Sequence, residues 1–502
     1  MFARQTRVAV TMLALTSAAG VSCSRPARLA ADLVVTHANV WTGNPLQPAA
    51  AAVAVIGDRI VDVGDAQEIE RWRSAATTVV DAEGRRLVAG FNDAHVRFVG
   101  GGTQLDDVDL TDAMTAAEFA RRINERAKAK PGEWVLGGRW DERRWSPAAL
   151  PTRALIDDIT NSSPVFVVRY DGRMALANAT ALGRSGISEH TPDPPGGSIV
   201  RDANGYPTGV LQGAAMEMVA RTIPAVTVEQ RQRALKRALE LAESLGVTSV
   251  QDLGASAEDV GVYADLVNRR ELTVRVYAAL LESDWYDQAK LGVHRAFGSP
   301  WLRIGAVRAP CDPGSIPEPM RTRLMAADHA GLQVSMLPNG EGSVTRALDV
   351  FGDILRANGG RDRRFRLDGW PIAPGDADRL ASLDVVASPQ TGTADSQARA
   401  LLERGVRLSL GSGWPSAPLN PMLALDAVVT AGLSPSQALS AFTAGSAVAE
   451  FQESEKGTIA RGRLADLAIL SADVLTIPPA QIKQARVLTT IAGGKVVHQR
   501  KP

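Results

Sequence analysis

Helix-like and strand-like segments alternate through most of the 502-residue chain, and this alternation constrains the fold more than any other feature. Val226–Gly246 has the spacing of a long amphipathic helix that ends at a glycine, and an apolar strand, Val247–Gly254, follows it. The same unit recurs at Thr322–Leu337, Gly375–Pro389 and Ser396–Ser412. Such repeated units predict an α/β fold, a TIM-type (β/α)8 barrel whose functional residues lie at the carboxyl ends of its strands.

Both ends of the chain have a different pattern. Residues 32–88 and 455–502 contain short alternating stretches that Gly and Asp separate, as in antiparallel hairpins. We therefore predict a small composite β-sandwich built from both termini, with the barrel between them at residues 89–450. Residues from about 140 to 215 are richer in Gly and Pro, which favours an insertion over the functional face of the barrel.

The stretch Leu87–Gly102 carries the clearest candidate site. An apolar run reaches Gly90, and Asp93, His95 and Arg97 follow at alternate positions, which places their side chains on one side of a strand end. Two histidines at this spacing would grip a metal ion, but an arginine takes the second place here. The glycines at 100–102 are expected to form a flexible turn.

Composition excludes several classes of partner and cofactor. The formal net charge is zero, so no electrostatic argument supports binding to nucleic acid or to an anionic membrane surface. Of the six histidines, none are paired at the spacings that metal ligands favour, and only His95 is predicted to lie at the barrel mouth. Because zinc sites select imidazole and thiolate donors, we expect no metal site and no cofactor.

The N-terminus has the pattern of an export signal. Arg4 and Arg7 precede an apolar run, Val8–Val21, that is too short to span a bilayer. We therefore predict that residues 1–23 direct export. The run Val21–Cys23 is also similar to a bacterial lipoprotein signal, which would attach a lipid to Cys23; an unmodified or removed Cys23 is the alternative. The expected location is periplasmic, with membrane contact only through that lipid.

Longer motifs point to a family. They are AGFNDAH at Ala89–His95, together with Gly137–Trp145, Pro164–Leu182, Gly246–Gly254, Leu410–Leu423 and Lys456–Leu470. Together they resemble the amidohydrolase superfamily, in particular the family 3 branch of metal-dependent hydrolases. The resemblance implies a TIM-type barrel, the composite β-sandwich and a metal site at the barrel mouth that activates a water molecule.

The positions at which that family carries metal ligands hold other residues in this chain. The resemblance places most of the replaced ligands, in chain order, at Arg97, Arg173, Arg308, Leu337, Gly369 and Gly413. Asp171 and Asp368 are retained carboxylates of two of these motifs. The resemblance therefore implies that the metal site of the family is largely lost.

The arginines at three of these positions admit two interpretations. They either form internal ion pairs with the carboxylates expected nearby, or they build an anion-binding pocket, since a guanidinium grips carboxylate or phosphate in a bidentate fashion. The carboxylates in the first interpretation are Asp93, Asp171 and Asp368. Trp370 and Trp414 are candidates for an aromatic wall of the same ligand site.

Three functions follow. We favour an exported, degenerate amidohydrolase-like protein that has lost metal-dependent hydrolysis and binds a small anionic or aromatic ligand. The alternative is an active hydrolase of non-peptide carbon–nitrogen bonds, with His95 as base, Asp171 and Asp368 in support, and Arg97 or Arg173 as oxyanion stabiliser. The third is a structural or interaction protein of the cell envelope. Whether the chain is an enzyme, and its oligomeric state, stay open at this point.

Overall fold

The computed structural model describes residues 29–160, 162–312, 314–369, 372–389 and 397–500. Within these residues no helix combines the length and the apolar character that crossing a membrane requires. The predicted export signal, Cys23 and Trp370 lie outside the described residues.

Eight parallel strands form the central barrel, which confirms the predicted fold class. In sheet order they are β8 (Phe91–Val96), β15 (Val247–Leu253), β16 (Arg275–Leu281), β18 (Leu302–Cys311), β19 (Gln333–Pro338), β20 (Arg366–Leu367), β21 (Val386–Ala387) and β22 (Arg407–Leu408). Beyond β22 the chain pairs with β8, because the Ala94 N–H donates to the Leu410 carbonyl and the Gly413 N–H donates to the His95 carbonyl, each at 2.9 Å. These bonds close the barrel.

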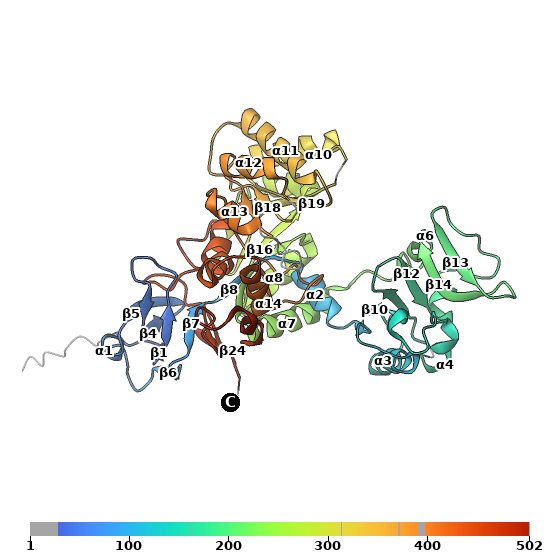
Figure 1. Ribbon diagram of the computed structural model, residues 1–502, viewed down its shortest axis with the longest axis horizontal. Helices are drawn as coiled ribbons and strands as arrows, with labels where there is room; N and C mark the ends of the chain where they lie inside the picture. The colour runs from blue at the N-terminus through green and yellow to red at the C-terminus, as the bar shows by residue number, and fades with distance from the viewer. Residues whose placement is uncertain (1–28, 161, 313, 370–371, 390–396, 501–502) are drawn as a thin grey trace, which may run out of the picture.

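Helices surround the barrel and alternate with its strands (Figure 1). They are α2 (Phe98–Gln104), α7 (Val228–Ser244), α8 (Ala257–Arg269), α9 (Trp285–Lys290), α10 (Glu318–His329), α11 (Ser343–Asn358), α12 (Ala377–Ser382), α13 (Gln397–Glu403), α14 (Pro421–Thr430) and α15 (Pro435–Ser440). Helix α7 has a capping box at Thr227 and buries its apolar face, as its sequence spacing predicts.

The glycines at 100–102 lie inside α2, so the predicted flexible turn is wrong. Their lack of a side chain serves close packing: a Cβ on Gly101 would come within 2.4 Å of the Trp414 ring, and one on Gly102 would come within 2.1 Å of the Ala234 carbonyl oxygen. Tertiary packing overrides the low helix propensity of glycine at this position.

Two sheets at one side of the barrel combine strands from both ends of the chain (Figure 1). One has the order β5-β4-β1-β6, with bounds Arg59–Gly64, Ala52–Ile56, Leu33–Thr36 and Thr78–Asp81. The other has the order β25-β24-β23-β7-β2-β3, with bounds Lys495–Gln499, Val487–Ala492, Leu467–Leu470, Arg86–Ala89, Asn39–Trp41 and Ala49–Ala50. Apolar residues of both sheets share one buried cluster, as in a sandwich.

A buried ion pair joins this sandwich to the barrel. Arg275 on β16 donates to both carboxylate oxygens of Asp466, at 2.7 and 3.1 Å, and the two side chains are 2% and 4% exposed. The Gly493 N–H also donates to Asp466 at 2.8 Å, and the Trp301 ring lies 4.2 Å from the Arg275 guanidinium. Both charged groups of this ion pair therefore have additional partners, the Gly493 N–H for Asp466 and the Trp301 ring for Arg275.

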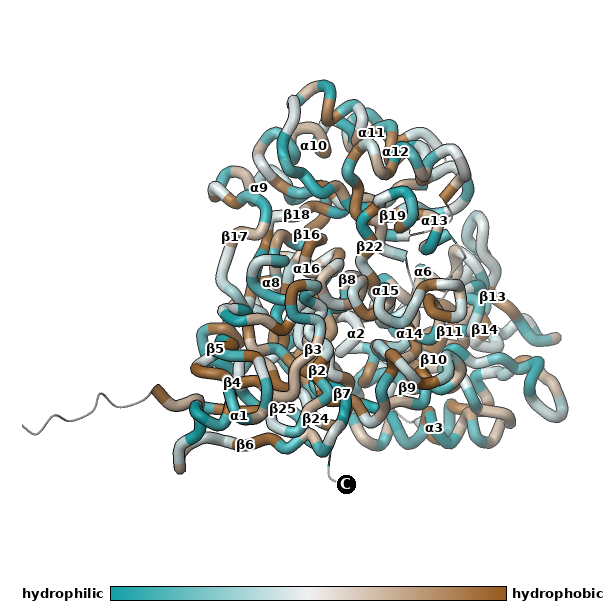
Figure 2. The backbone as a smooth tube through the Cα atoms, turned by 60° about the vertical axis from the view of Figure 1, so that its left-hand side comes forward, coloured by the Kyte–Doolittle hydropathy of each residue, from teal (hydrophilic) through white to brown (hydrophobic). Residues whose placement is uncertain are grey.

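A third sheet forms a unit of its own between β8 and α7, which we call the insertion unit. Its strands, in sheet order, are β13 (Gly197–Arg201), β14 (Pro207–Gly213), β12 (Met174–Ala177), β11 (Phe166–Arg169), β10 (Gly137–Trp140) and β9 (Val108–Asp109). Its helices are α3 (Ala116–Ala129), α4 (Asp157–Thr160), α5 (Ala179–Arg184) and α6 (Ala214–Ala220). Figure 1 shows this unit beside the barrel, and the tube of α3 alternates between hydrophobic and hydrophilic residues in Figure 2.

Candidate functional site

Strand β8 brings the first candidate residues into the barrel. Gly90 separates it from β7 of the sandwich, and a Cβ there would come within 2.2 Å of the Thr248 side chain. All six residues of β8 are buried, and Asp93 and His95 share one face of the strand. Asp93 accepts hydrogen bonds from the backbone N–H groups of His95 at 3.1 Å and Ser412 at 2.9 Å. The shared direction of Asp93 and His95 agrees with their alternating positions in the sequence.

Burial keeps His95 uncharged. Burial lowers the pKa of His95 to about 4. The negative charge of Asp368 raises this pKa, whereas the positive charges of the nearby arginines lower it; these are Arg308, Arg366 and Arg97. Burial also raises the pKa of Asp93 to about 6, against the hydrogen bonds from Ser412 and His95. At neutral pH the imidazole at the mouth is a neutral group.

The retained carboxylates are held by arginines other than those that the sequence analysis proposed. Asp368 accepts a hydrogen bond from Arg366 at 2.7 Å, and the two side chains are 0% and 1% exposed. The Ser335 hydroxyl donates to the other oxygen of Asp368. In the insertion unit Asp171 pairs with Arg169 at 2.6 Å. The expected ion pairs with Arg97, Arg173 and Arg308 are therefore not formed.

Arg308 and Arg97 are left as cations without a carboxylate of their own. Arg308 is 8% exposed, and within the described residues neither it nor Arg97 has an ion pair or a side-chain hydrogen bond. Burial lowers the pKa of Arg308, and the charge of Arg97 lowers it further, whereas the carboxylates of Asp368 and Asp252 act in the opposite direction. Arg97 itself is exposed at the end of β8. The two guanidinium groups therefore lie close enough to repel each other.

Asp171 and Arg173 are not part of this region. Asp171 also accepts the backbone N–H of Arg173 at 3.1 Å, and both residues belong to the turn between β11 and β12 of the insertion unit. The charges that act on Arg308 are those of Arg97, Asp368 and Asp252. The structure therefore brings together His95, Arg97, Arg308 and Asp368 but not these two residues.

Two residues of the mouth, Asp252 and Arg366, are not among the residues predicted from the sequence. Asp252 on β15 is 2% exposed, accepts a hydrogen bond from the Tyr263 hydroxyl at 2.6 Å, and has its pKa raised by burial to about 7. Arg366 also donates to the Ala94 carbonyl at 2.7 Å. A signal existed for the second: Arg366 stands two residues before Asp368, so both side chains lie on one face of a strand.

Trp414 packs against the barrel helix α2 and also lines a cavity. Its ring contacts Phe98 edge-on, with ring centroids 5.8 Å apart, and it covers Gly101. It also lines a cavity of about 590 Å³ between the barrel and the insertion unit, whose wall on the other side includes Asp107–Asp109 and Gly137–Arg139. The predicted role of Trp414 in an aromatic wall of a ligand site stays a prediction.

The donor set does not fit the metal site of the family. Across the described part of the chain, no group of three or more His, Cys, Asp or Glu side chains is placed to hold a metal ion. Of the donors that remain at the mouth, Asp368 is occupied by Arg366 and Ser335, and cationic Arg97 and Arg308 stand beside His95. Guanidinium groups repel a divalent cation, so these residues do not fit the metal site that the resemblance implies.

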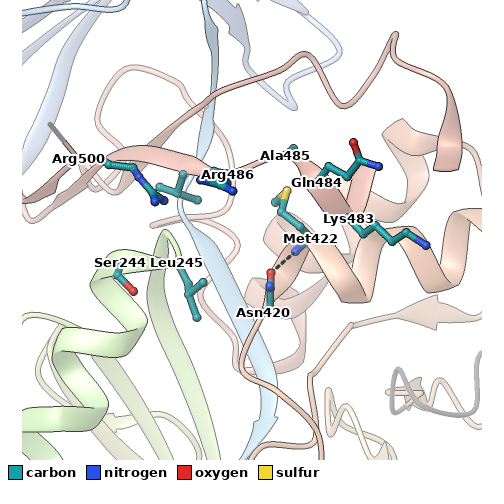
Figure 3. A pocket seen from close by; sticks show the side chains of 10 residues that line it. Ser244, Leu245, Asn420, Met422, Lys483, Gln484, Ala485, Arg486 and Arg500 are labelled. Carbon is teal, nitrogen blue, oxygen red and sulfur yellow. Dashed lines mark hydrogen bonds between the residues drawn. The ribbon is translucent and has the colours of Figure 1, made fainter. Parts of the chain in front are cut away.

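A basic cavity of about 550 Å³ lies on the outside of the barrel (Figure 3). It is lined by Lys483, Arg486 and Arg500, with Ser244 and Leu245 opposite. In Figure 3 Arg486 and Arg500 stand together, whereas Lys483 extends away from them. All three basic side chains are exposed, so this cavity provides a reference against which the buried cation at the mouth can be tested.

A closed (β/α)8 barrel with its polar groups at one end is the scaffold of barrel enzymes, and comparison with known proteins identifies the class. A profile of the amidohydrolase family matches residues 78–498. The protein LONG AFTER FAR-RED 3 of Arabidopsis thaliana is 33% identical over 548 aligned residues, which cover 95% of this chain and 93% of that protein. N-substituted formamide deformylase of Arthrobacter pascens is 27% identical, over 93% of this chain and 98% of that protein.

Solved structures agree with this assignment of the fold. A metal-dependent hydrolase from Pyrococcus horikoshii OT3 superposes with a TM-score of 0.73 at 21% sequence identity, over 89% of this chain and 99% of that one. The chain belongs to the amidohydrolase family, as its motifs predicted.

Proposed function

We propose that this protein is a member of the amidohydrolase family that has lost metal-dependent hydrolysis and binds a small organic anion at the barrel mouth. Arg308 is the buried anchor for the anion, and Arg97 is a second contact at the rim. Following the pattern of the N-terminus, the proposal places this binding outside the cytoplasm.

The observation that carries the proposal is that the buried carboxylate of Asp368 pairs with Arg366, while Arg308 has no carboxylate partner among the described residues. The buried carboxylate of Asp368 is neutralised by Arg366 at 2.7 Å, so it is not available to Arg308. A buried guanidinium without a partner is unfavourable, and a carboxylate or phosphate group relieves it with two parallel hydrogen bonds.

The loss of hydrolysis follows from the same residues. Metal-dependent hydrolysis needs ligands that hold a cation and a group that accepts the proton of the attacking water. Here His95 is neutral and is surrounded by three guanidinium groups, and Gly413 stands where the resemblance places the aspartate. This proposal therefore includes no resident metal.

The test combines elemental analysis with anion binding. Benzoate and inorganic phosphate are titrated into the mature protein and followed by thermal shift and calorimetry, with Arg308→Gln as the test variant and Arg486→Gln as the matched control on the exposed basic cavity. We expect Arg308→Gln to weaken anion binding at least about tenfold, the loss of one charge-assisted contact, and Arg486→Gln to leave it unchanged.

Two results would overturn the proposal. Equal anion affinity in the two variants would show that the mouth is not the binding site. A stoichiometric metal in the purified protein, together with turnover of an N-substituted formamide that His95→Ala abolishes, would instead establish the active hydrolase that the Arthrobacter relative suggests.

A further inference from the structure

A separate cavity lies on the outer side of the barrel, between α8 and α9. It has a volume of about 450 Å³ and opens beside the carboxyl ends of β15 and β16. Its apolar walls are Val260, Leu280, Leu281, Leu291, Val293 and Ile304. Leu281 and Leu291 are 44% and 80% exposed, so the rim of the cavity presents apolar side chains to solvent. An exposed apolar rim around a cavity of this size is typical of a ligand site.

One buried polar group interrupts this apolar lining. The Gln288 side chain on α9 lines the cavity and is 4% exposed, yet in the described part of the chain neither its Oε1 nor its Nε2 has a hydrogen-bond partner. Its backbone is satisfied, because the Gln288 carbonyl accepts the Val293 N–H at 3.0 Å. A buried amide with both of its polar atoms unpaired is unfavourable, so a group that supplies one donor and one acceptor would be held here.

The charge around the cavity restricts the ligand further. Glu258, Asp284 and Asp287 line it, and no Lys or Arg is among its lining residues. A negatively charged ligand is therefore disfavoured, in contrast to the region of Arg308. The two regions are adjacent, since a Cβ on Gly254, which also lines the cavity, would lie 3.3 Å from Arg308 Nη1.

We propose that this cavity binds an uncharged or cationic small molecule that carries a primary amide group and an apolar substituent. The primary amide of the ligand pairs with the Gln288 amide: one ligand N–H donates to Oε1, and the ligand carbonyl accepts from Nε2. The apolar substituent fills the space between Val260, Leu280 and Ile304. The site is independent of the anion site at the mouth, which has the opposite charge preference.

The experiment uses hexanamide, a primary amide, as the probe and hexanoate, which has the same number of heavy atoms, as the charged match. Binding to the mature protein is followed by ligand-observed NMR and calorimetry at pH 7. We expect saturable binding of hexanamide, and at least about tenfold weaker binding of hexanoate because of the carboxylates at the rim. Gln288→Leu should weaken binding of hexanamide at least about tenfold, whereas Gln484→Leu, at an exposed glutamine of the basic cavity, should not.

A second variant covers the case in which Gln288→Leu fails to fold. Ala257 is exposed at the start of α8 and lines the cavity, so Ala257→Trp should block entry without a change in the core. Unchanged binding in either folded variant, or equal affinity for hexanoate, would overturn the proposal. Loss of anion binding at the mouth would leave it unaffected, since the probe carries no charge.

Discussion

Two buried arginines of the barrel mouth are predicted to have opposite effects on stability. Arg366 is 1% exposed and is paired with Asp368, whereas Arg308 is 8% exposed and has no ion pair within the described residues. Replacement of each by methionine keeps much of the side-chain volume and removes the charge. The comparison therefore tests what the partners of a buried arginine contribute, which for Arg366 include the Ala94 carbonyl and Gln251.

The structure gives the sign and the size of each effect. Arg366→Met leaves the fully buried Asp368 carboxylate with the Ser335 hydroxyl alone, and breaking a buried pair in this way costs about 3–5 kcal/mol. Arg308→Met removes a desolvated cation that Arg97 repels, so we expect a gain of about 1–2 kcal/mol in the ligand-free protein. The same variant should lose anion binding, because the charge that is unfavourable in the free protein is the one that holds the ligand.

The assay is urea unfolding followed by tryptophan fluorescence, with hydrogen exchange of the β8 and β20 segments as a local readout. Arg486→Met serves as the control, since its exposed side chain should change stability by no more than about 0.5 kcal/mol. A loss of stability in Arg308→Met comparable to that in Arg366→Met would refute the reasoning, because it would mean that Arg308 is compensated as well as Arg366 is.

Two further predictions concern close packing and a buried ion pair. Gly101→Ala should destabilise the protein by about 1–3 kcal/mol, because its Cβ would collide with the Trp414 ring. Gly100→Ala in the same helix should be neutral or stabilise by up to about 1 kcal/mol; thermal unfolding and tryptophan fluorescence of both variants check this, and equal effects would contradict it. Asp466→Asn should cost about 3–5 kcal/mol because it leaves Arg275 buried without its partner; unfolding at the wild-type midpoint would contradict it.

The fold could be predicted from the sequence because its elements are locally consistent. The amphipathic stretch Val226–Gly246 forms α7 at Val228–Ser244, and the apolar stretch after it forms β15. Periodicity and a terminal glycine suffice for such elements. The prediction of a flexible turn at glycines 100–102 was wrong, because these residues are helical and pack against Trp414, which is more than three hundred positions away in the chain.

The site was only partly predictable, because the sequence does not show which arginine pairs with which carboxylate. The positions of Asp93 and His95 on one face of a strand follow from their spacing alone. Which arginine neutralises which carboxylate is decided by neighbouring residues: Arg366 precedes Asp368 by two positions, and Arg169 precedes Asp171 by two. In both pairs the arginine lies in a strand and the carboxylate follows the end of that strand, so the partners are close in the sequence. The burial that raises the pKa of Asp252 has no such sequence signal.

The pH dependence of the mouth provides the last prediction. Asp252 contacts Tyr263 and is under the influence of Asp259, Arg97 and Arg308, and burial raises its pKa to about 7. The folded protein therefore binds a proton at Asp252 that the unfolded chain releases near its ordinary pKa. Stability should fall as pH rises from about 4 to about 7, with a slope of at most about 1.4 kcal/mol per pH unit from this group.

Anion binding should follow the same titration. Above about pH 7 the Asp252 carboxylate is ionised and competes for Arg308 and Arg97, so anion affinity should rise as the pH is lowered from 8 to 6. Asp252→Asn keeps an acceptor for the Tyr263 hydroxyl and cannot ionise, so the variant should lose this rise and part of the slope in stability. The measurement is benzoate affinity and urea unfolding at several pH values for both proteins. A parallel pH dependence in the two proteins would show that Asp252 does not titrate beside the anion site.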